Sequence, residues 1–479
     1  MAGPRYDFDL LCIGSGPAGQ RAAIQAAKLG KRVAVIERRR LLGGVCAETG
    51  TIPSKTFREA VLSFMCAAHH VEQHLGNHFD SRPTAAQVLA RVAEVTKREV
   101  EVVADQLRRN DVILIQGEAS FTDAHTVTVA SSEQEPRIVT AANILIAVGT
   151  IPAHPEGVPV DGEVILTSDD MLNLKRLPRK MVVIGGGIIG LEYASMLAAL
   201  KINVTLVDKR THLLEFVDSE IVEELLHQMR NRNVTFRLGE AVERLEVTDD
   251  QPRRAVLTLE SGKRIVAESV LYSVGRVGAA GRLNLGAAGL SADKRGRLTV
   301  DAQFRTEIPH IFAAGDIIGY PSLASTSASQ GRHVACYAFG VEIDSMPEHG
   351  PVGIYAIPEI SMVGPSEQEL TEQHVPYETG VARYREIARG QILGDDSGLV
   401  KLLFHREDRR LLGVHAIGTG ATELIHIGQA VLDLGGGLNY FLRTVFNYPT
   451  LAECYKVAAL DAYNKLSMCM AYEQKENPS

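Results

Sequence analysis

One βαβ pattern occurs twice in this chain, and each marked position of the second copy lies 171 residues after its counterpart in the first. In both copies an apolar run leads into Gly-x-Gly-x-x-Gly, a helical stretch follows, and a second apolar run closes on a carboxylate. The repeated positions are Gly14, Gly16, Gly19 and Glu37 in the first copy and Gly185, Gly187, Gly190 and Asp208 in the second. The chain must therefore contain two similar α/β units.

The spacing within each copy has a chemical explanation. Glycines permit a tight turn and let backbone N–H groups approach a pyrophosphate closely. The following helix adds the positive end of its dipole, and the closing carboxylate accepts hydrogen bonds from ribose hydroxyls. A lone Gly-x-Gly-x-x-Gly is weak evidence, but two in register, each between a strand and a helix, predict two dinucleotide sites.

The length of the chain sets the domain plan around these units. A chain of 479 residues is too long for one core and should form about three domains. We expect an α/β fold with two Rossmann-like dinucleotide-binding domains and an α+β C-terminal domain. The expected ranges are 1–155 and 275–348 for the first nucleotide domain, 156–274 for the second, and 349–479 for the C-terminal domain. The residue patterns predict helices within 53–109, strands within 112–148, and a last helix from Leu451 to Leu466.

Composition excludes several other classes of protein. The formal charge is −8 with both signs interspersed, so the sequence favours neither nucleic acid nor an anionic membrane as partner. It contains no apolar run of the roughly 20 residues that a membrane span needs, and its first residues do not resemble a signal peptide. Six cysteines without a CxxC pair predict neither a disulfide framework nor a metal site, and a reducing cytoplasm is the expected compartment.

The loop GGVCAETGTIPSK, residues 43–55, resembles the flavoprotein disulfide reductases, and the likeness extends over nearly the whole chain. It also rests on the two glycine turns, on GLEYA at 190–194, on Ala314-Gly315-Asp316, and on Pro449-Thr450 with Glu453. Within that family the stretches GTIPSK, GDIIGYPSLAS, GIYAIPEIS, ELIHIGQA and FNYPTLAE are most similar to the soluble transhydrogenases. The resemblance implies FAD at the first turn, NAD(H) or NADP(H) at the second, and a homodimer or larger homo-oligomer formed through the dimerisation domain 349–479.

The same resemblance implies the residues of the site. For FAD they are Gly14, Gly16, Gly19, Glu37, Gly44, Lys55, Gly149 and Asp316. For the nicotinamide nucleotide they are Gly185, Gly187, Gly190, Asp208, Arg210 and Gly275. Asp316 should hydrogen-bond the flavin ribitol, and Lys55 should pair with Glu192 beside the flavin ring. Tyr193 corresponds to an aromatic gate over the nicotinamide pocket, although a packing role on the sheet is nearly as well supported.

Two parts of the disulfide-reducing machinery are missing from this sequence. The family spacing is Cys-x-x-x-x-Cys, whereas here Cys46 is followed by Thr51, whose hydroxyl can neither form a disulfide nor store two electrons. The histidine that precedes proline in the family is replaced by Tyr448, a poor base near neutral pH, while Glu453 is retained. The candidate catalytic residues are therefore Lys55, Glu192, Cys46, Thr51, Tyr448 and Glu453, with Cys46 interpreted as a small packing residue near the flavin.

Without sulfur chemistry, the remaining steps are hydride transfer from a reduced nicotinamide to flavin N5 and from N5 to an acceptor. An oxidised nicotinamide as acceptor makes the reaction a transhydrogenation between NADPH and NAD⁺. The alternatives are an NAD(P)H-dependent quinone or dye reductase, and a flavin-bearing subunit without turnover. The intact second glycine turn argues against the last, because a scaffold needs no nicotinamide site.

The residues after the second closing carboxylate give mixed signals about nucleotide preference. Asp208 favours NAD(H), because a carboxylate accepts the ribose 2′-OH and repels a 2′-phosphate. Lys209 and Arg210 follow at once, and either could approach that phosphate. Alternatively, both are merely solvated and the chain prefers NAD(H). We expect both nucleotides to reduce the flavin.

Overall fold

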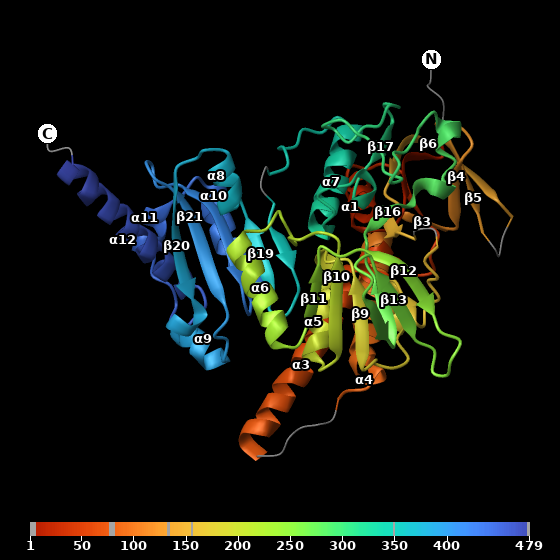
Figure 1. Cartoon of the computed structure of the whole chain (residues 1–479). Helices are drawn as coiled ribbons and strands as arrows, with labels where there is room; N and C mark the ends of the chain where they lie inside the picture. The colour runs from red at the N-terminus through yellow and green to blue at the C-terminus, as the bar shows by residue number, and fades with distance from the viewer. Residues whose placement is uncertain (1–5, 76–81, 132–134, 155–156, 348–349, 477–479) are drawn as a thin grey trace. The chain divides into compact units, whose positions relative to one another are not determined.

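The computed structural model describes residues 6–75, 82–131, 135–154, 157–347 and 350–476. The chain divides into two compact units, Met1–Leu177 with Val274–Met346, and Pro178–Ser273 with Pro347–Ser479 (Figure 1). The α/β class is confirmed, since parallel strands alternate with helices in both units. Residues 157–177 cluster with the first unit, and the second glycine turn shares a unit with the C-terminal segment. The three-domain boundaries expected from the sequence remain a prediction.

The first unit is built on a sheet in the order β3-β2-β1-β6-β5-β4, with β17 paired to β6. Its strands are β1 (Phe8–Ile13), β2 (Val33–Glu37), β3 (Ile113–Gln116), β4 (Glu118–Phe121), β5 (Thr126–Ala130), β6 (Arg137–Ile146) and β17 (Ile311–Ala313). Strands β3, β2, β1, β6 and β17 run parallel. β1 and β2 are mostly apolar and almost completely buried, as is typical of central strands in a parallel sheet that is covered on both faces.

Helices complete this unit. They are α1 (Pro17–Lys28), α2 (Gly44–Glu48), α3 (Thr51–Leu75), α4 (Ala85–Arg108) and α7 (Ala324–Ala338). α1 and α7 pack side by side (Figure 1), so closely that a Cβ at Gly331 would lie 2.0 Å from the carbonyl oxygen of Ala18. α4 begins at a capping box in which Thr84 and Gln87 satisfy each other's backbone N–H groups. The helices expected within 53–109 are confirmed in the described stretches. A short antiparallel pair, β7 (Thr150–Pro152) with β16 (Arg276–Gly278), joins the unit's two chain segments.

The second nucleotide-binding segment repeats this plan in the second unit. Its parallel strands lie in the order β11-β10-β9-β15. They are β9 (Lys180–Ile184), β10 (Asn203–Asp208), β11 (Thr235–Leu238) and β15 (Ser269–Tyr272), with helices α5 (Ile188–Ala199) and α6 (Ser219–Asn231). A separate antiparallel sheet holds β12 (Val242–Val247), β13 (Ala255–Leu259) and β14 (Arg264–Ala267). Because α5 is buried over almost its whole length, apolar residues occur on all of its faces.

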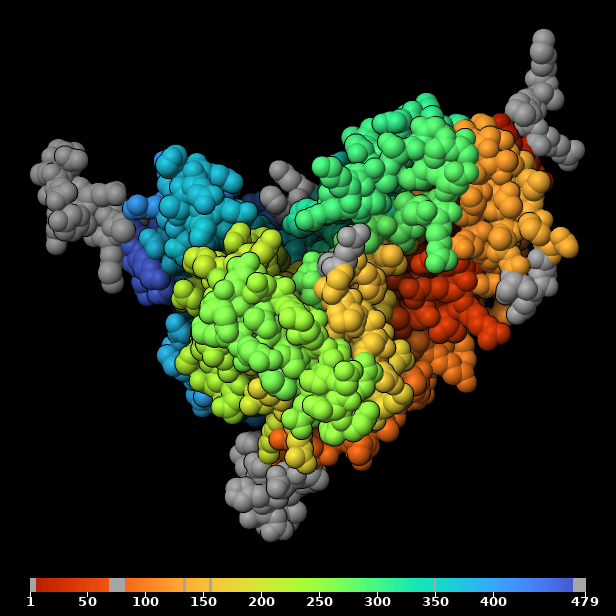
Figure 2. Space-filling view, turned by 45° about the vertical axis from the view of Figure 1, so that its right-hand side comes forward, coloured from red at the N-terminus to blue at the C-terminus, as the bar shows by residue number. Residues whose placement is uncertain are grey.

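The C-terminal segment forms an antiparallel sheet in the order β18-β19-β22-β21-β20. The strands are β18 (Val352–Ile354), β19 (Ile360–Val363), β20 (Tyr377–Arg383), β21 (Leu399–His405) and β22 (Leu411–Ile417). Its helices are α8 (Glu367–Glu372), α9 (Ala388–Leu393), α10 (Ala421–Asp433), α11 (Leu438–Arg443) and α12 (Glu453–Glu476). α12 lies directly on β20, because a Cβ at Gly380 would meet the carbonyl oxygen of Ala458 at 2.0 Å. α6 contacts β22, and Figure 2 shows yellow-green residues of the nucleotide-binding segment against cyan residues of the C-terminal one.

The last helix differs from the one expected at 451–466. It begins at Glu453, because a turn closed by the Glu453 N–H on the carbonyl of Thr450 precedes it. It continues to Glu476 because the residues after Leu466 are mostly good helix formers. None of the helices in the described ranges is both long and apolar enough to cross a membrane.

Candidate functional site

The first glycine turn connects β1 to α1. Of its three motif glycines, only Gly16 has open space where a side chain would lie. A Cβ at Gly14 would lie 2.4 Å from the carbonyl oxygen of Ala147, and one at Gly19 would lie 1.9 Å from that of Gly14. At Gly16 a Cβ would meet nothing within 4 Å. Gly16 is also the N-cap of α1 and provides no side-chain cap, so the first N–H groups of the helix remain available. Open space at a helix N-terminus fits the pyrophosphate of a dinucleotide.

Glu37 lies at the end of β2, beside this turn. Its Oε2 accepts hydrogen bonds from the backbone N–H of Ser15 at 3.0 Å and the hydroxyl of Ser15 at 2.6 Å, and its Oε1 accepts from the Arg39 N–H at 2.9 Å. The Ser15 hydroxyl also accepts from the N–H of Gly43, which ties the glycine turn to the loop that carries Cys46. Gly44 lies against the same turn, where a Cβ would come within 3.0 Å of the Gly16 Cα.

Cys46 lies on α2 and faces the start of α3. Its thiol hydrogen-bonds the side chain of Thr51, which stands where a disulfide reductase has its second thiol. Burial raises the pKa of Cys46 more than the Thr51 hydrogen bond lowers it. The charges of Glu99 and Asp316 raise this pKa further, while Lys55 acts in the opposite direction. The site therefore brings Cys46, Thr51, Lys55 and Asp316 together around a neutral thiol.

A buried polar atom lies in the same loop. The Thr49 hydroxyl oxygen is inaccessible to solvent, yet it has no hydrogen-bond partner among the described residues. Buried hydroxyls normally find a partner. Together with the open space at Gly16 and at Gly149, where a Cβ would meet nothing within 4 Å, this hydroxyl fits the presence of a large polar cofactor. The residues present therefore fit FAD.

Asp316 follows β17 and lies beside Thr150, whose hydroxyl is 3.5 Å from its Oδ2. Burial raises the pKa of Asp316, partly offset by the positive charge of Arg276 and by hydrogen bonds from Thr150 and Ser327. Arg276 donates to the hydroxyl of Thr150 at 2.9 Å and to its carbonyl at 3.0 Å. The sequence did not indicate Arg276, although it directly follows Gly275. The hydrogen bond of Asp316 to the ribitol remains a prediction.

The second glycine turn reproduces the first. A Cβ at Gly190 would lie 1.9 Å from the carbonyl oxygen of Gly185, whereas one at Gly187 would meet nothing within 4 Å. The Gly186 N–H donates to the Asp208 Oδ2 at 2.6 Å, which repeats the bond from Ser15 to Glu37. The turn, the helix start and the closing carboxylate are thus arranged as for a second dinucleotide.

Asp208 is bound by Arg210 through both backbone and side chain, whereas Arg39, at the equivalent position of the first turn, binds Glu37 through its N–H and Glu48 through its guanidinium. The Arg210 guanidinium donates to Asp208 Oδ1 at 3.0 Å and to Oδ2 at 2.7 Å, and the Arg210 N–H donates to Oδ1 at 2.8 Å. Burial by itself would raise the pKa of Asp208, but the hydrogen bonds and charge of Arg210 lower it overall. Arg210 is thus bound to the carboxylate beside it, while Lys209 is exposed. How either cation acts on a nucleotide remains a prediction.

Glu192 and Tyr193 are both buried on α5, with 3% and 2% of their surface exposed. The Glu192 Oε1 accepts a hydrogen bond from the Tyr355 N–H at 2.8 Å, a contact that the sequence did not indicate. Lys55 belongs to the first unit and Glu192 to the second, so their pairing beside the flavin remains a prediction. The role of Tyr193 as a gate over the nicotinamide pocket also remains a prediction.

Tyr448 and Glu453 lie around the start of α12. Tyr448 is 72% exposed in the single chain. The Glu453 Oε2 is buried and has no hydrogen-bond partner within the described part of the chain. Their role as candidate catalytic residues remains a prediction.

The cysteines and acidic residues show no further redox or metal centre in the ranges that the structure covers. Cys12, Cys46, Cys66, Cys336 and Cys454 are all free, and the side chain of Cys469 lies outside the described residues. Among those described, no three His, Cys, Asp or Glu side chains are grouped so that they could hold a metal ion.

Comparisons with known proteins show the family of the chain. Residues 8–331 match the family described as pyridine nucleotide-disulphide oxidoreductase, and residues 350–459 match its dimerisation domain. A protein named soluble pyridine nucleotide transhydrogenase from Mycobacterium tuberculosis is 52% identical, over 96% of this chain and 98% of its own. A protein of the same name from Photobacterium profundum is 44% identical with the same coverage.

Solved structures show the same architecture. The crystal structure of LpdA from Mycobacterium tuberculosis has a TM-score of 0.87 and 26% identity, over 94% of this chain and 99% of that chain. RclA, a HOCl-induced flavoprotein disulfide reductase from Escherichia coli, has a TM-score of 0.85 at 24% identity over the same shares, and shows the fold alone. The chain belongs to the pyridine nucleotide-disulphide oxidoreductase family, as a flavoprotein oxidoreductase whose cofactors are FAD and nicotinamide nucleotides.

Proposed function

We propose that the chain is an FAD-dependent transhydrogenase that moves a hydride between NADPH and NAD⁺ without an internal disulfide. The observation that carries the proposal is the partner of Cys46, which is the hydroxyl of Thr51 and not a thiol. A hydroxyl cannot close a disulfide, so this loop cannot accept an electron pair. Relatives that are named transhydrogenases and align over nearly the whole chain support the same reaction.

The residues of the chain bind and orient, and they need not move protons. When bound, FAD supplies an N5 that accepts and returns a hydride. The two glycine turns hold the pyrophosphates of FAD and of the nicotinamide nucleotide, while Glu37 and Asp208 accept hydrogen bonds from ribose. Because a hydride passes between two nicotinamides, the reaction consumes no proton at a protein base, and Tyr448 in place of histidine is no obstacle.

The residues around Cys46 shape the flavin site in this proposal. Lys55 and Glu192 act as a charged pair beside the flavin ring. Cys46 remains a protonated thiol, because burial raises its pKa, and with Thr51 it fills the space of the missing disulfide. Asp316 accepts a hydrogen bond from the ribitol, and Tyr448 and Glu453 contribute from the partner subunit of a homodimer.

The stereochemistry belongs to the proposal as well. We assign the chain to the Si-specific type, in which the hydride leaves the 4S position of NADPH. Deuterium at 4S of NADPH should therefore be lost on oxidation, and deuterium at 4R should be retained.

An anaerobic titration tests the proposed reaction. NADPH should bleach the flavin absorbance, and NAD⁺ added afterwards should restore it while NADH appears. A quinone or dye reductase would be reduced by NADPH but would pass electrons to NAD⁺ poorly, and a flavin-bearing subunit without turnover would not be reduced. Either result overturns the proposal.

A further inference from the structure

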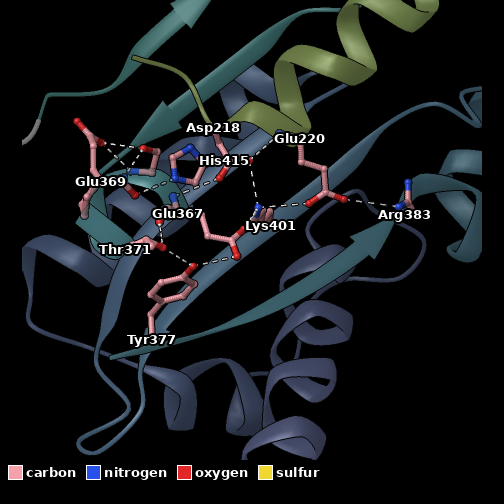
Figure 3. A network of polar contacts seen from close by, with 11 residues as sticks. Asp218, Glu220, Glu367, Glu369, Thr371, Tyr377, Arg383, Lys401 and His415 are labelled. Carbon is pink, nitrogen blue, oxygen red and sulfur yellow. Dashed lines mark hydrogen bonds and ion pairs between the residues drawn. The ribbon is translucent and has the colours of Figure 1, made fainter. Parts of the chain in front are cut away.

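Lys401 is a buried cation surrounded by three carboxylates in the second unit (Figure 3). Lys401 lies on β21, and 3% of its side chain is exposed. Its Nζ lies 3.0 Å from the Asp218 Oδ1 and 3.3 Å from the Glu220 Oε2, and it also bonds the Glu367 carboxylate. Asp218 and Glu220 come from the start of α6, and Glu367 comes from the start of α8. The cluster thus joins the nucleotide-binding segment to the C-terminal segment.

Lys401 is the charge that holds this cluster together. Burial would lower the pKa of Lys401, but the hydrogen bonds and charges of Glu367 and Asp218 outweigh it and raise the pKa overall. His415, the neighbouring titratable group on β22, is neutral, because complete burial lowers its pKa and its Nε2 is bound to the Pro365 carbonyl at 3.0 Å. Arg383 reaches only the outer carboxylate, Glu220, at 3.7 Å.

Removing the Lys401 charge would therefore leave carboxylates crowded together. Asp218 is completely buried and would lose its ion pair with Lys401. A buried carboxylate without its partner cation is unfavourable, and this one lies at the start of α6. Asp218 is the N-cap of that helix, where its Oδ1 accepts the Glu220 N–H at 3.1 Å. Its Oδ2 accepts the Glu367 N–H at 3.3 Å. The position of the α6 N-terminus thus depends on this cluster.

The loop 209–217 leads from Asp208 to the cluster and lines the second glycine turn. Leu213 and Val217 of this loop are buried. Leu213 packs on the glycine turn, because a Cβ at Gly186 would come within 2.7 Å of its Cδ2. The loop begins with the two cations, Lys209 and Arg210, and ends at Asp218. Its far end is fixed by Lys401, whereas Asp208 is fixed by the sheet, where it pairs in register with Leu238.

We infer that Lys401 is a positioning residue for NADP(H), acting through Asp218 on the loop 209–217. The inference rests on the proposed function only in that the chain uses both nucleotides. The side chains expected to contact a 2′-phosphate, Lys209 and Arg210, belong to the loop, whereas the one expected to contact a 2′-OH is Asp208 on β10. A loop released from Lys401 should therefore lose affinity for NADP(H) more than for NAD(H).

The experiment measures flavin reduction by NADPH and by NADH separately in the holoenzyme, by anaerobic stopped flow, for wild type and Lys401→Met. We expect the apparent Kd for NADPH to rise about three- to tenfold relative to that for NADH, with both limiting reduction rates within about twofold of wild type. Lys401→Arg, which keeps the charge, should restore much of the ratio. Lys465→Met removes a half-exposed lysine paired with Asp461 on α12 and serves as the matched control, with the ratio unchanged.

The outcomes separate this inference from the proposed reaction. A lower Tm for Lys401→Met with an unchanged ratio of the two Kd values overturns the inference. If Lys401→Met does not fold, Asp218→Asn, which keeps an acceptor for the α6 cap, must shift the ratio in the same direction, and an unchanged ratio overturns the inference. Failure of the wild type to pass electrons from NADPH to NAD⁺ would refute the transhydrogenase and leave the Kd comparison valid.

Discussion

At the scale of single residues, Asp208 and Arg210 place opposite charges side by side at the end of β10, where the ribose of a nucleotide is expected to bind. The carboxylate is buried at the end of β10, and the guanidinium that covers it is about half exposed. We expect the Arg210 guanidinium to turn away from the carboxylate when a nucleotide binds, because the arginine side chain itself is partly exposed to solvent. We then expect a ribose 2′-OH to donate to the Asp208 carboxylate and a 2′-phosphate to accept from the Arg210 guanidinium. One site would in this way admit both nucleotides in turn, as the proposed function requires.

Substitution at these two residues should shift the nucleotide preference in opposite directions. Arg210→Ala should raise the KM for NADPH more than the KM for NADH, by about three- to tenfold, since solvent screening limits the loss. Asp208→Asn should raise the KM for NADH more than the KM for NADPH, because an amide is a weaker acceptor for the 2′-OH and no longer repels the 2′-phosphate. Steady-state kinetics with both nucleotides measure the effect. Lys209→Ala is the control, and an unchanged KM ratio in the first two variants would remove the specificity role from this loop.

Cys46 should react slowly with alkylating agents at neutral pH. Burial raises its pKa, so the thiolate, which is the reactive form, is scarce until the pH rises well above neutrality. Exposed Cys66 provides the internal comparison. Mass spectrometry of iodoacetamide-treated holoenzyme at about pH 7 and about pH 9 should show Cys66 modified first and Cys46 gaining reactivity at the higher pH. Modification of Cys46 ahead of Cys66 at neutral pH would indicate an activated thiol.

Restoring the second thiol should not create a disulfide reductase. Thr51→Cys places a thiol within contact of Cys46, so a disulfide can form, but Tyr448 still cannot take and return the proton at sulfur. We expect lipoamide and glutathione disulfide to remain unreduced by NADPH in both wild type and variant. The double variant with Tyr448→His is the informative comparison, because it supplies the missing base. Rapid lipoamide turnover by the wild type would contradict the assignment.

The sequence predicted the geometry of the two glycine turns, whereas the roles of their residues toward a nucleotide stay predictions. The two glycine turns and their carboxylates were predictable, because strand, turn and helix follow one another within a few tens of residues. Tyr355 and Lys401 were not predictable, since their partners Glu192 and Asp218 lie far away along the chain. The same holds for the contact of Arg276 with Thr150.

At the scale of elements, the two glycine turns separate packing from ligand binding. Gly190→Ala should destabilise the protein by about 2 to 3 kcal/mol or more, because its Cβ would overlap the carbonyl oxygen of Gly185. Gly187→Ala should fold normally, since its backbone is extended and its Cβ meets no atom. That methyl group would instead occupy the space for the nucleotide pyrophosphate and raise the KM for both nucleotides about tenfold or more.

Thermal unfolding, FAD content and steady-state kinetics distinguish the two variants. Gly187→Ala should retain FAD and the wild-type Tm, and Gly190→Ala should lose stability first. If Gly187→Ala binds both nucleotides as well as the wild type, the open space in front of α5 is not where the pyrophosphate lies.

Elements with strong periodicity were predicted closely, and element ends were not. β1, β2, β9 and β10 lie where their apolar runs predicted them. The end of α12 could not be read from apolar spacing, because the residues after Leu466 continue the helix through their helix propensity, which that spacing does not measure.

At the scale of the whole molecule, the sequence indicated two nucleotide folds and a C-terminal α+β segment but not their grouping. The second nucleotide segment shares a compact unit with the C-terminal segment. Buried polar contacts between them explain this, since Lys401 binds the start of α6 and the Ile357 N–H donates to the Ser195 hydroxyl at 3.0 Å. Both contacts join residues that are far apart along the chain, and no local pattern indicates them.

The C-terminal segment should hold two copies of the chain together. Leu434 and Val445 are apolar but 86% and 93% exposed in the single chain, and Tyr448 lies close to Val445 in sequence with most of its surface free. Single apolar side chains are common on surfaces, but here they accompany a buried Glu453 oxygen that lacks a partner within the described residues. A second copy covering this surface would bury these exposed apolar side chains, in agreement with the match of residues 350–459 to a dimerisation domain. We therefore expect an obligate homodimer.

Val445→Asp should weaken that homodimer, because it places a charge where the partner subunit is expected to bury an apolar side chain. Light scattering coupled to size-exclusion chromatography should show a monomer or a concentration-dependent mixture. Transhydrogenase activity should fall with the dimer fraction, since Tyr448 and Glu453 are expected to complete the partner's flavin site. Val266→Asp, on β14, is the matched control, because Val266 is also an exposed valine but lies outside the C-terminal segment. It should leave both mass and activity unchanged. A Val445→Asp monomer with full activity would show that one chain completes its own flavin site.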